Sequence, residues 1–227
     1  DMPSDRSGQS SSASTRVYLV LTLLLWFGLC VVVPARPAQA QSPIVVSSTA
    51  DSGPNTLRQA ILDAAPESTV TFAPHLAGQT ITLSSVLAIL KDLTIDGSSL
   101  QPPVTLSGGN ASRLIEVHSP HIVHLTGLIF AEGSSDDFDR GGAITNWGPN
   151  LTVSGCTFQE NESPFGGGAI VSYTGLDILA STFLANSAVS DDGGAILIVA
   201  GGASVTNSTF VDNTAAFGGA ITIDPGA

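Results

Sequence analysis

Gly141-Gly142-Ala143-Ile144 is the first of four copies of one phrase, Gly-Gly-Ala-Ile. The copies begin at residues 141, 167, 193 and 218, so their spacings are 26, 26 and 25 residues. A second phrase, Phe-x-x-Asn, runs between them and begins at residues 158, 183 and 210. Two interleaved phrases that share one period indicate a tandem structural repeat.

Each repeat reads as short β-strands joined by tight turns. Aligned copies give columns of like residues: Leu151/Leu176/Ala203, Val153/Ile178/Val205, Cys156/Ser181/Ser208 and Phe158/Phe183/Phe210. Large apolar residues alternate with small or polar ones, which is the period of a strand. Gly, Asn, Ser and Asp recur between these runs and favour turns. About 25 residues with three short strands are typical of one coil of a parallel β-helix.

Stacked coils lie about 4.8 Å apart, so like residues of successive coils lie directly above one another. The sequence therefore predicts a Phe stack and an Ile stack inside the coil and an Asn ladder at one turn, since such ladders stabilise in-register strands. One degenerate unit precedes the clear repeats, because Val123, Leu125, Leu128 and Phe130 match the same columns.

Gly-Gly-Ala-Ile alternating with Phe-x-x-Asn resembles the polymorphic outer-membrane proteins and related bacterial surface β-helices. The segment 45–51, followed by Thr56–Ile61, is similar to the N-terminal segment of CSLREA-type secreted repeat proteins. This chain departs from that motif, because it has Asn-Thr-Leu-Arg-Gln-Ala where the motif has Cys-Ser-Leu-Arg-Glu-Ala. The resemblance covers about residues 44–227. It implies a right-handed parallel β-helix of the pectin-lyase-like type and no single activity.

Residues 1–40 have the pattern of a secretory signal peptide. Arg16 precedes the apolar run 17–33, and Ala38-Gln39-Ala40 forms a small-x-small cleavage site. The alternative is a retained membrane anchor, since 17 apolar residues are near the lower limit for a span. We expect a secreted or cell-surface protein, bacterial outer-membrane or extracellular, that contacts a membrane only through this segment or through an anchor beyond residue 227.

Residues 41–68 are predicted to form an N-terminal cap. Residues 44–46 read as a strand, and residues 55–65 read as an amphipathic helix that begins in a capping box of Thr56 and Gln59. Such a helix can cover the open end of a β-helix, where unpaired strand edges otherwise promote aggregation. Residues 69–227 are predicted to form the β-helix itself, with irregular early coils, and we expect the natural protein to continue beyond them.

The charge balance and the cysteines narrow the classes of function. The net charge of −12 argues against nucleic-acid binding. Cys156 is the one cysteine after the leader, and its column partners are serines, so we expect a small, buried, inert thiol. His118, His121 and His124 lie near a Pro120 turn with mixed parity, which favours ordinary exposed histidines over a metal cluster.

Acidic residues recur in the loops that follow the Phe strands. The calcium candidates among them are Asp136, Asp137, Asp139, Asp191 and Asp192. Stacked on one edge, they are compatible with a Ca²⁺ site, because Ca²⁺ takes several oxygen ligands. They are also compatible with a solvated edge. Calcium is the one cofactor that the sequence suggests, and the sequence assigns no catalytic residue.

Two functions remain open. The first is a structural, adhesin-like or passenger module that contacts extracellular glycan or surface protein along its flanks. The second is an extracellular polysaccharide lyase or glycosidase. A glycosidase needs two carboxylates across a groove, which Asp137 or Asp139 with Asp191 or Asp192 could supply. A lyase needs a base, and Arg140 is the only basic residue near these loops. The acidic balance opposes pectate-like substrates.

Overall fold

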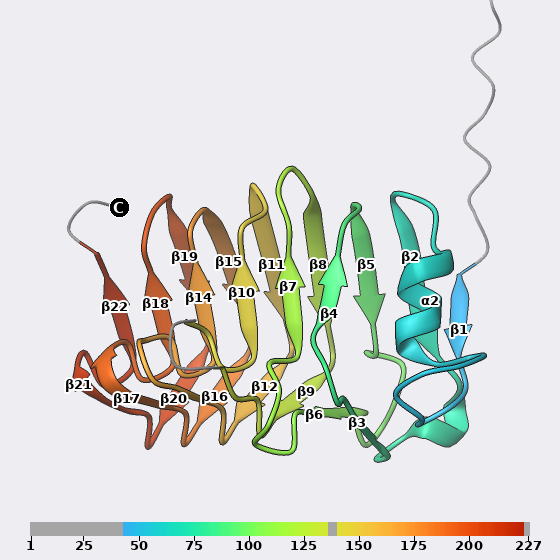
Figure 1. Ribbon diagram of the computed structural model, residues 1–227, viewed down its shortest axis with the longest axis horizontal. Coiled ribbons are helices and arrows are strands. Elements are labelled where there is room, and N and C mark those ends of the chain that lie inside the picture. The colour runs from blue at the N-terminus through green and yellow to red at the C-terminus, as the bar shows by residue number, and fades with distance from the viewer. Residues whose placement is uncertain (1–42, 136–139, 225–227) are drawn as a thin grey trace, which may run out of the picture. The chain divides into compact units, whose positions relative to one another are not determined.

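The computed structural model describes residues 43–135 and 140–224 and shows a parallel β-helix of about seven turns (Figure 1). Every strand pairing is parallel, so each coil adds one strand to each sheet that it enters. The predicted all-β parallel β-helix is therefore confirmed.

Four sheets run along the coil. Sheet A contains β1 (Ile44–Val46), β2 (Ser68–Phe72), β5 (Leu93–Asp96), β8 (Ile122–Thr126), β11 (Asn150–Ser154), β15 (Gly175–Leu179) and β19 (Ala203–Thr206). Sheet B contains β3 (Thr80–Thr82), β6 (Thr105–Ser107), β9 (Ile129–Ala131), β12 (Thr157–Gln159), β16 (Thr182–Leu184) and β20 (Thr209–Val211). Sheet C contains β4 (Leu87–Ile89), β7 (Ile115–Val117), β10 (Ile144–Asn146), β14 (Ile170–Ser172), β18 (Ile196–Ile198) and β22 (Ile221–Ile223). Sheet D contains β13 (Glu162–Ser163), β17 (Ser187–Asp192) and β21 (Thr214–Phe217).

The predicted Phe stack runs through the core. Phe158 pairs with Phe130 on one side and Phe183 on the other, and Phe183 pairs with Phe210. Neighbouring ring centroids lie 4.7, 4.8 and 4.8 Å apart, with interplanar angles of 11° or less. The degenerate unit that ends at Phe130 is thus one full coil. Stacking at the strand spacing holds four rings in one column, of which Phe130, Phe158 and Phe183 are buried and Phe210 is partly buried.

The Asn ladder lies at the turn after sheet B. Asn161 Nδ2 donates to Asn186 Oδ1 at 2.9 Å, and Asn186 Nδ2 donates to Asn213 Oδ1 at 2.8 Å. Each of these amides also donates to a carbonyl of the preceding coil, Phe130 O for Asn161 and Phe158 O for Asn186. Asn161 and Asn186 are completely buried. Because every donor meets an acceptor one coil away, the ladder fixes the register of neighbouring coils.

The Gly-Gly pair opens four strands of sheet C, β10, β14, β18 and β22, for two separate reasons. The first glycine of the copies at 141, 167, 193 and 218 has a φ of +81°, +62°, +69° and +60°, a region that costs other residues strain. The second glycine meets the next coil at close range. A Cβ at Gly168 would lie 2.2 Å from the carbonyl oxygen of Gly194, so only glycine fits there.

Helix α2 (Leu57–Asp63) lies at the N-terminal end and packs against β1 (Figure 1). Thr56 accepts a hydrogen bond from Gln59 N, as predicted, but Gln59 donates its side-chain amide to Asp63, so the reciprocal half of the capping box does not form. A short 3₁₀ helix, η1 (Pro74–Leu76), precedes β3. Across residues 43–135 and 140–224, no helix is long and apolar enough to cross a membrane.

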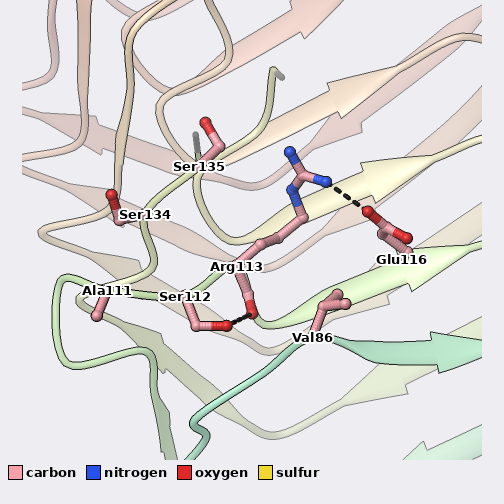
Figure 2. Close-up of a pocket in the computed structure, with 7 residues that line it drawn as sticks. All are labelled: Val86, Ala111, Ser112, Arg113, Glu116, Ser134 and Ser135. Carbon is pink, nitrogen blue, oxygen red and sulfur yellow. Dashed lines mark hydrogen bonds and ion pairs between the residues drawn. The ribbon is translucent and has the colours of Figure 1, made fainter. Parts of the chain in front are cut away.

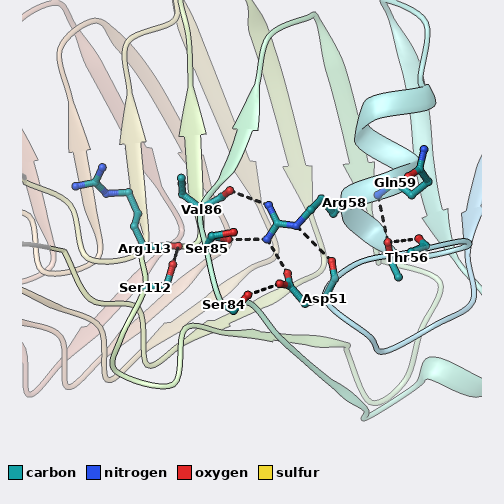
Figure 3. A network of polar contacts seen from close by, with 10 residues as sticks. Asp51, Thr56, Arg58, Gln59, Ser84, Ser85, Val86, Ser112 and Arg113 are labelled. Carbon is teal, nitrogen blue, oxygen red and sulfur yellow. Dashed lines mark hydrogen bonds and ion pairs between the residues drawn. The ribbon is translucent and has the colours of Figure 1, made fainter.

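Arg58 fastens α2 to the next coil (Figure 3). Its guanidinium donates to Ser85 O at 2.7 Å, to Val86 O at 2.9 Å and to Asp51 Oδ1 at 2.6 Å. Ser84 Oγ in turn donates to Asp51 Oδ2 at 2.5 Å. The Leu-Arg-Gln-Ala segment thus buries its leucine and alanine in the core and directs its arginine to the turn before β4. The hydrogen bonds from the guanidinium to the carbonyls of this turn explain why position 58 is an arginine.

Replacing Asn186 with alanine is expected to destabilise the coil by about 3 kcal/mol, because the Asn161 amide and the Phe158 carbonyl each lose a buried partner. Asn150→Ala is the control, since Asn150 makes an exposed hydrogen bond to Asp177, and it should cost about 0.5 kcal/mol. Chemical denaturation of the two variants measures both values. Equal losses would contradict the central role of the ladder.

The Asp51–Arg58 link is expected to weaken in acid. Partial burial raises the pKa of Asp51, but the hydrogen bond from Ser84 and the hydrogen bond and charge of Arg58 lower it further, so the net pKa lies below the ordinary 3.8. The unfolded chain therefore takes up this proton first. The stability that the carboxylate contributes is present above pH 3.8 and is lost as the pH falls through the lower folded-state pKa.

Asp51→Asn should accordingly flatten the decline of the unfolding free energy below about pH 4. Asp177→Asn, which removes an exposed carboxylate from sheet A, should leave that decline unchanged. Denaturation at a series of pH values between about 6 and about 2.5, a range that spans the ordinary carboxyl pKa, compares the two variants with the wild-type chain. Parallel curves for wild type and Asp51→Asn would rule the link out as a source of the acid sensitivity.

Candidate functional site

A polar hollow of about 210 Å³ opens where sheet C begins (Figure 2). Its lining residues are Val86, Ala111, Ser112, Arg113, Glu116, Ser134 and Ser135. Three successive coils supply them, because residues 86, 111–116 and 134–135 lie in consecutive turns of the chain. The hollow is thus a product of coil stacking.

Arg113 is the buried charge at this hollow, with 8% of its surface exposed. Its guanidinium donates to Glu116 Oε1 at 2.5 Å, to Gly141 O at 2.9 Å and to Arg140 O at 3.1 Å. The side chain therefore ties β7 to the start of the first Gly-Gly-Ala-Ile copy. Arg140 was singled out from the sequence, whereas Arg113 was not, because Arg113 belongs to no motif. Its position 28 residues before Gly141, about one coil, is the signal that could have revealed it.

The acidic edge is organised partly as predicted. Segments that follow the Phe strands do stack, and they form sheet D rather than loose loops. Asp192 ends β17, where the register with β21 shifts, and its carbonyl oxygen accepts from Gly167 N at 3.0 Å. Asp191 belongs to the same strand. Asp136, Asp137 and Asp139 lie outside the described residues.

In the part of the chain that the structure describes, no group of three or more His, Cys, Asp or Glu side chains could hold a metal ion. The proposed calcium candidates lie largely outside that part, so the calcium site stays a prediction. The glycosidase pair drawn from Asp137 or Asp139 with Asp191 or Asp192 stays a prediction for the same reason.

The three histidines take separate positions around the turn before β8. His118 Nε2 lies 3.4 Å from Glu116 Oε2, and His121 Nδ1 lies 3.5 Å from Asp92 Oδ1. His124 projects from the outer face of β8, where it is exposed. Their mixed parity thus places them in different surroundings.

A shallow groove of about 320 Å³ lies beside His124 on the outer face of sheet A, and Glu67 and Asp92 also line it. These two residues hold equivalent positions in adjacent coils, since Glu67 N donates to Asp92 O. Coils lie about 4.8 Å apart, and retaining glycosidases hold their two carboxyl groups about 5 Å apart. Asp92 Oδ1 accepts from Ile122 N at 2.9 Å, which orients that carboxylate. The groove therefore brings two carboxyl-bearing side chains of adjacent coils to one outer face.

A partly exposed aromatic pair lies at the corner where sheet C turns into sheet A. The rings of Trp147 and Tyr173 stack with centroids 3.9 Å apart and an interplanar angle of 7°. Trp147 is 43% exposed. This pair was not predicted from the sequence, because a tryptophan and a tyrosine do not form a column of identical residues. The signal was present, since each residue follows the isoleucine of a Gly-Gly-Ala-Ile copy by three positions.

Cys156 is confirmed as a buried thiol in the column that continues with Ser181. Burial raises its pKa to about 11, although hydrogen bonds from neighbouring backbone groups oppose the rise. At pH 8 the group is therefore a thiol and not the reactive thiolate.

In a chain carrying Cys30→Ser, we expect Cys156 to react with a disulfide reagent at least about a hundredfold more slowly when native than when unfolded in denaturant. The absorbance of the chromophore that the reagent releases measures both rates. A native rate equal to that of the unfolded chain would contradict the burial.

A scan against models of known protein families found no match, and a search of curated proteins found no relative. The class that the fold itself defines is the parallel β-helix. The likeness to polymorphic outer-membrane and CSLREA-type proteins remains a resemblance of motifs.

Proposed function

We propose that this chain is a secreted or cell-surface β-helical scaffold, an adhesin- or passenger-like module that contacts extracellular glycan or protein along its flanks. The observation that carries the proposal is the difference between inward and outward residues within each coil. Inward residues form continuous ladders, whereas the outer face of sheet A carries varied, solvent-exposed side chains. A rigid core with variable flanks suits a protein that presents a long contact surface.

Two features of the sequence support an extracellular location. Residues 1–40 have the pattern of a signal peptide. The chain also combines 24 glycines with only 11% charged residues, which suits a stacked-sheet domain whose stability comes from ladders. The location remains part of the proposal.

A polysaccharide hydrolase is the second candidate, favoured by the groove of Glu67 and Asp92. The two carboxylates come from adjacent coils, which lie about 4.8 Å apart, close to the carboxyl separation that retaining hydrolysis uses. The rest of this groove is contributed by Leu93, Thr94, Ile122 and His124. A shallow groove gives a long polymer access but excludes little water from the reacting bond.

The two candidates make opposite predictions for one experiment. The full chain is incubated with a panel of neutral and acidic polysaccharides and with intact cells, and both retention and release of reducing ends are measured. We expect retention on at least one surface with no released sugar, and unchanged retention for Glu67→Gln and Asp92→Asn. Product release that either variant abolishes would establish the hydrolase instead. Failure to bind any surface would contradict the scaffold.

A further inference from the structure

Five residues occupy the same place in five successive coils at the corner between sheets C and A, and the exposed Asp224 holds that place in the coil that follows. We call them the corner ladder: Leu90, His118, Trp147, Tyr173 and Val199. The backbone fixes their alignment, since Trp147 N donates to Val117 O, Tyr173 N to Asn146 O and Val199 N to Ser172 O. His118 N likewise donates to Ile89 O. At the strand spacing the ladder is about 20 Å long, and all five residues are exposed or half-buried.

Hydrogen bonds between the two turns hold the aromatic residues of the ladder, Trp147 and Tyr173, in place. Asn146, which is completely buried, donates its amide to Ser172 Oγ, to Thr174 Oγ1 and to Gly175 O, and its Oδ1 accepts from Gly148 N. Thr174 Oγ1 donates across the same corner to Gly148 O. The turns that carry Trp147 and Tyr173 are therefore tied together. Aromatic side chains in fixed positions bind a partner with little further loss of conformational entropy.

Polar side chains flank the ladder on the side of sheet A. Asn150 and Asp177 lie just past the two aromatic turns and share an exposed hydrogen bond of 3.0 Å. They present an amide and a carboxylate next to an apolar surface. A pyranose has the matching chemistry, because its C–H faces pack on apolar surface and its hydroxyl groups both donate and accept hydrogen bonds.

We propose that the corner ladder binds a neutral, extended, β-linked glycan chain that lies along the coil axis; the inference rests on the proposed scaffold function and names its ligand. The ladder is a single residue wide, whereas a stable protein interface needs about 800 Å² on each partner. A linear polymer fits a narrow, straight ridge. An extended β-linked chain presents one sugar ring after another along a line, as the stacked coils present one ladder residue after another about 4.8 Å apart. The net charge of −12 opposes an acidic polymer.

The test uses the full chain and three defined probes: β-1,4-linked hexasaccharides of glucose and of mannose, and the acidic hexagalacturonate. Calorimetric titration is expected to show binding of at least one neutral hexasaccharide with a Kd below about 1 mM. Trp147→Ala and Tyr173→Ala should each weaken it about tenfold or more. Leu179→Ala, which truncates a leucine 46% exposed on sheet A, should leave it unchanged.

Asp177→Ala separates recognition from folding, because it removes a flanking group without touching the aromatic stack. It should weaken binding about threefold to tenfold and lower the melting temperature by no more than about 2 °C. Binding that Trp147→Ala, Tyr173→Ala and Asp177→Ala all leave intact would overturn the corner ladder and leave the scaffold function standing. Stronger binding of hexagalacturonate would overturn the neutral ligand. A chain that binds no hexasaccharide, polysaccharide or cell surface would overturn both proposals.

Discussion

Hydrogen bonding from one asparagine amide to the next, coil after coil, is the constraint on which the rest of this structure depends. The carboxamide has both a donor and an acceptor, so Asn186 can accept from Asn161 and donate to Asn213 at once. A coil that slipped by one residue would place these groups, all away from water, against partners that cannot satisfy them. The parallel register of sheets B and D on either side of the ladder follows.

The register then determines what fills the core. It places Phe158 on Phe130 and Phe183 at the strand spacing, and it aligns Ile144 with Ile170. It also allows three strands of sheet C, β10, β14 and β18, to be buried on both faces. Val171 and Leu197 have the parity of outward residues, yet both are buried, because the loops that carry Gly141 and Gly166 fold over them. The glycines are required where these loops approach the strands too closely for a side chain.

The sequence was informative where one residue type repeats at a fixed period. The Phe stack, the Asn ladder and the Gly-Gly turns follow from such repeats, and a strand of the cap and its helix follow from local patterns at Thr56 and Leu57. Contacts between unlike residues were not accessible in this way. Arg58 meets backbone carbonyls, which any sequence supplies. Trp147 meets Tyr173, and Arg113 meets a carbonyl of the next coil.

The difference between repeated contacts and contacts of unlike residues explains why the sequence predicts the fold but not the site. Core positions must repeat, because each side chain packs on its own counterpart one coil away. Outward positions are free of that requirement. Some repeat, as Thr157, Thr182 and Thr209 do on sheet B, and others vary. The column of Thr152, Asp177 and Ser204 on sheet A varies in this way. The corner of sheets C and A departs from the pattern, since Trp147 is exposed and still stacks on the half-buried Tyr173. Core packing does not require an aromatic pair in water, and this is the physical reason to seek the contact surface there.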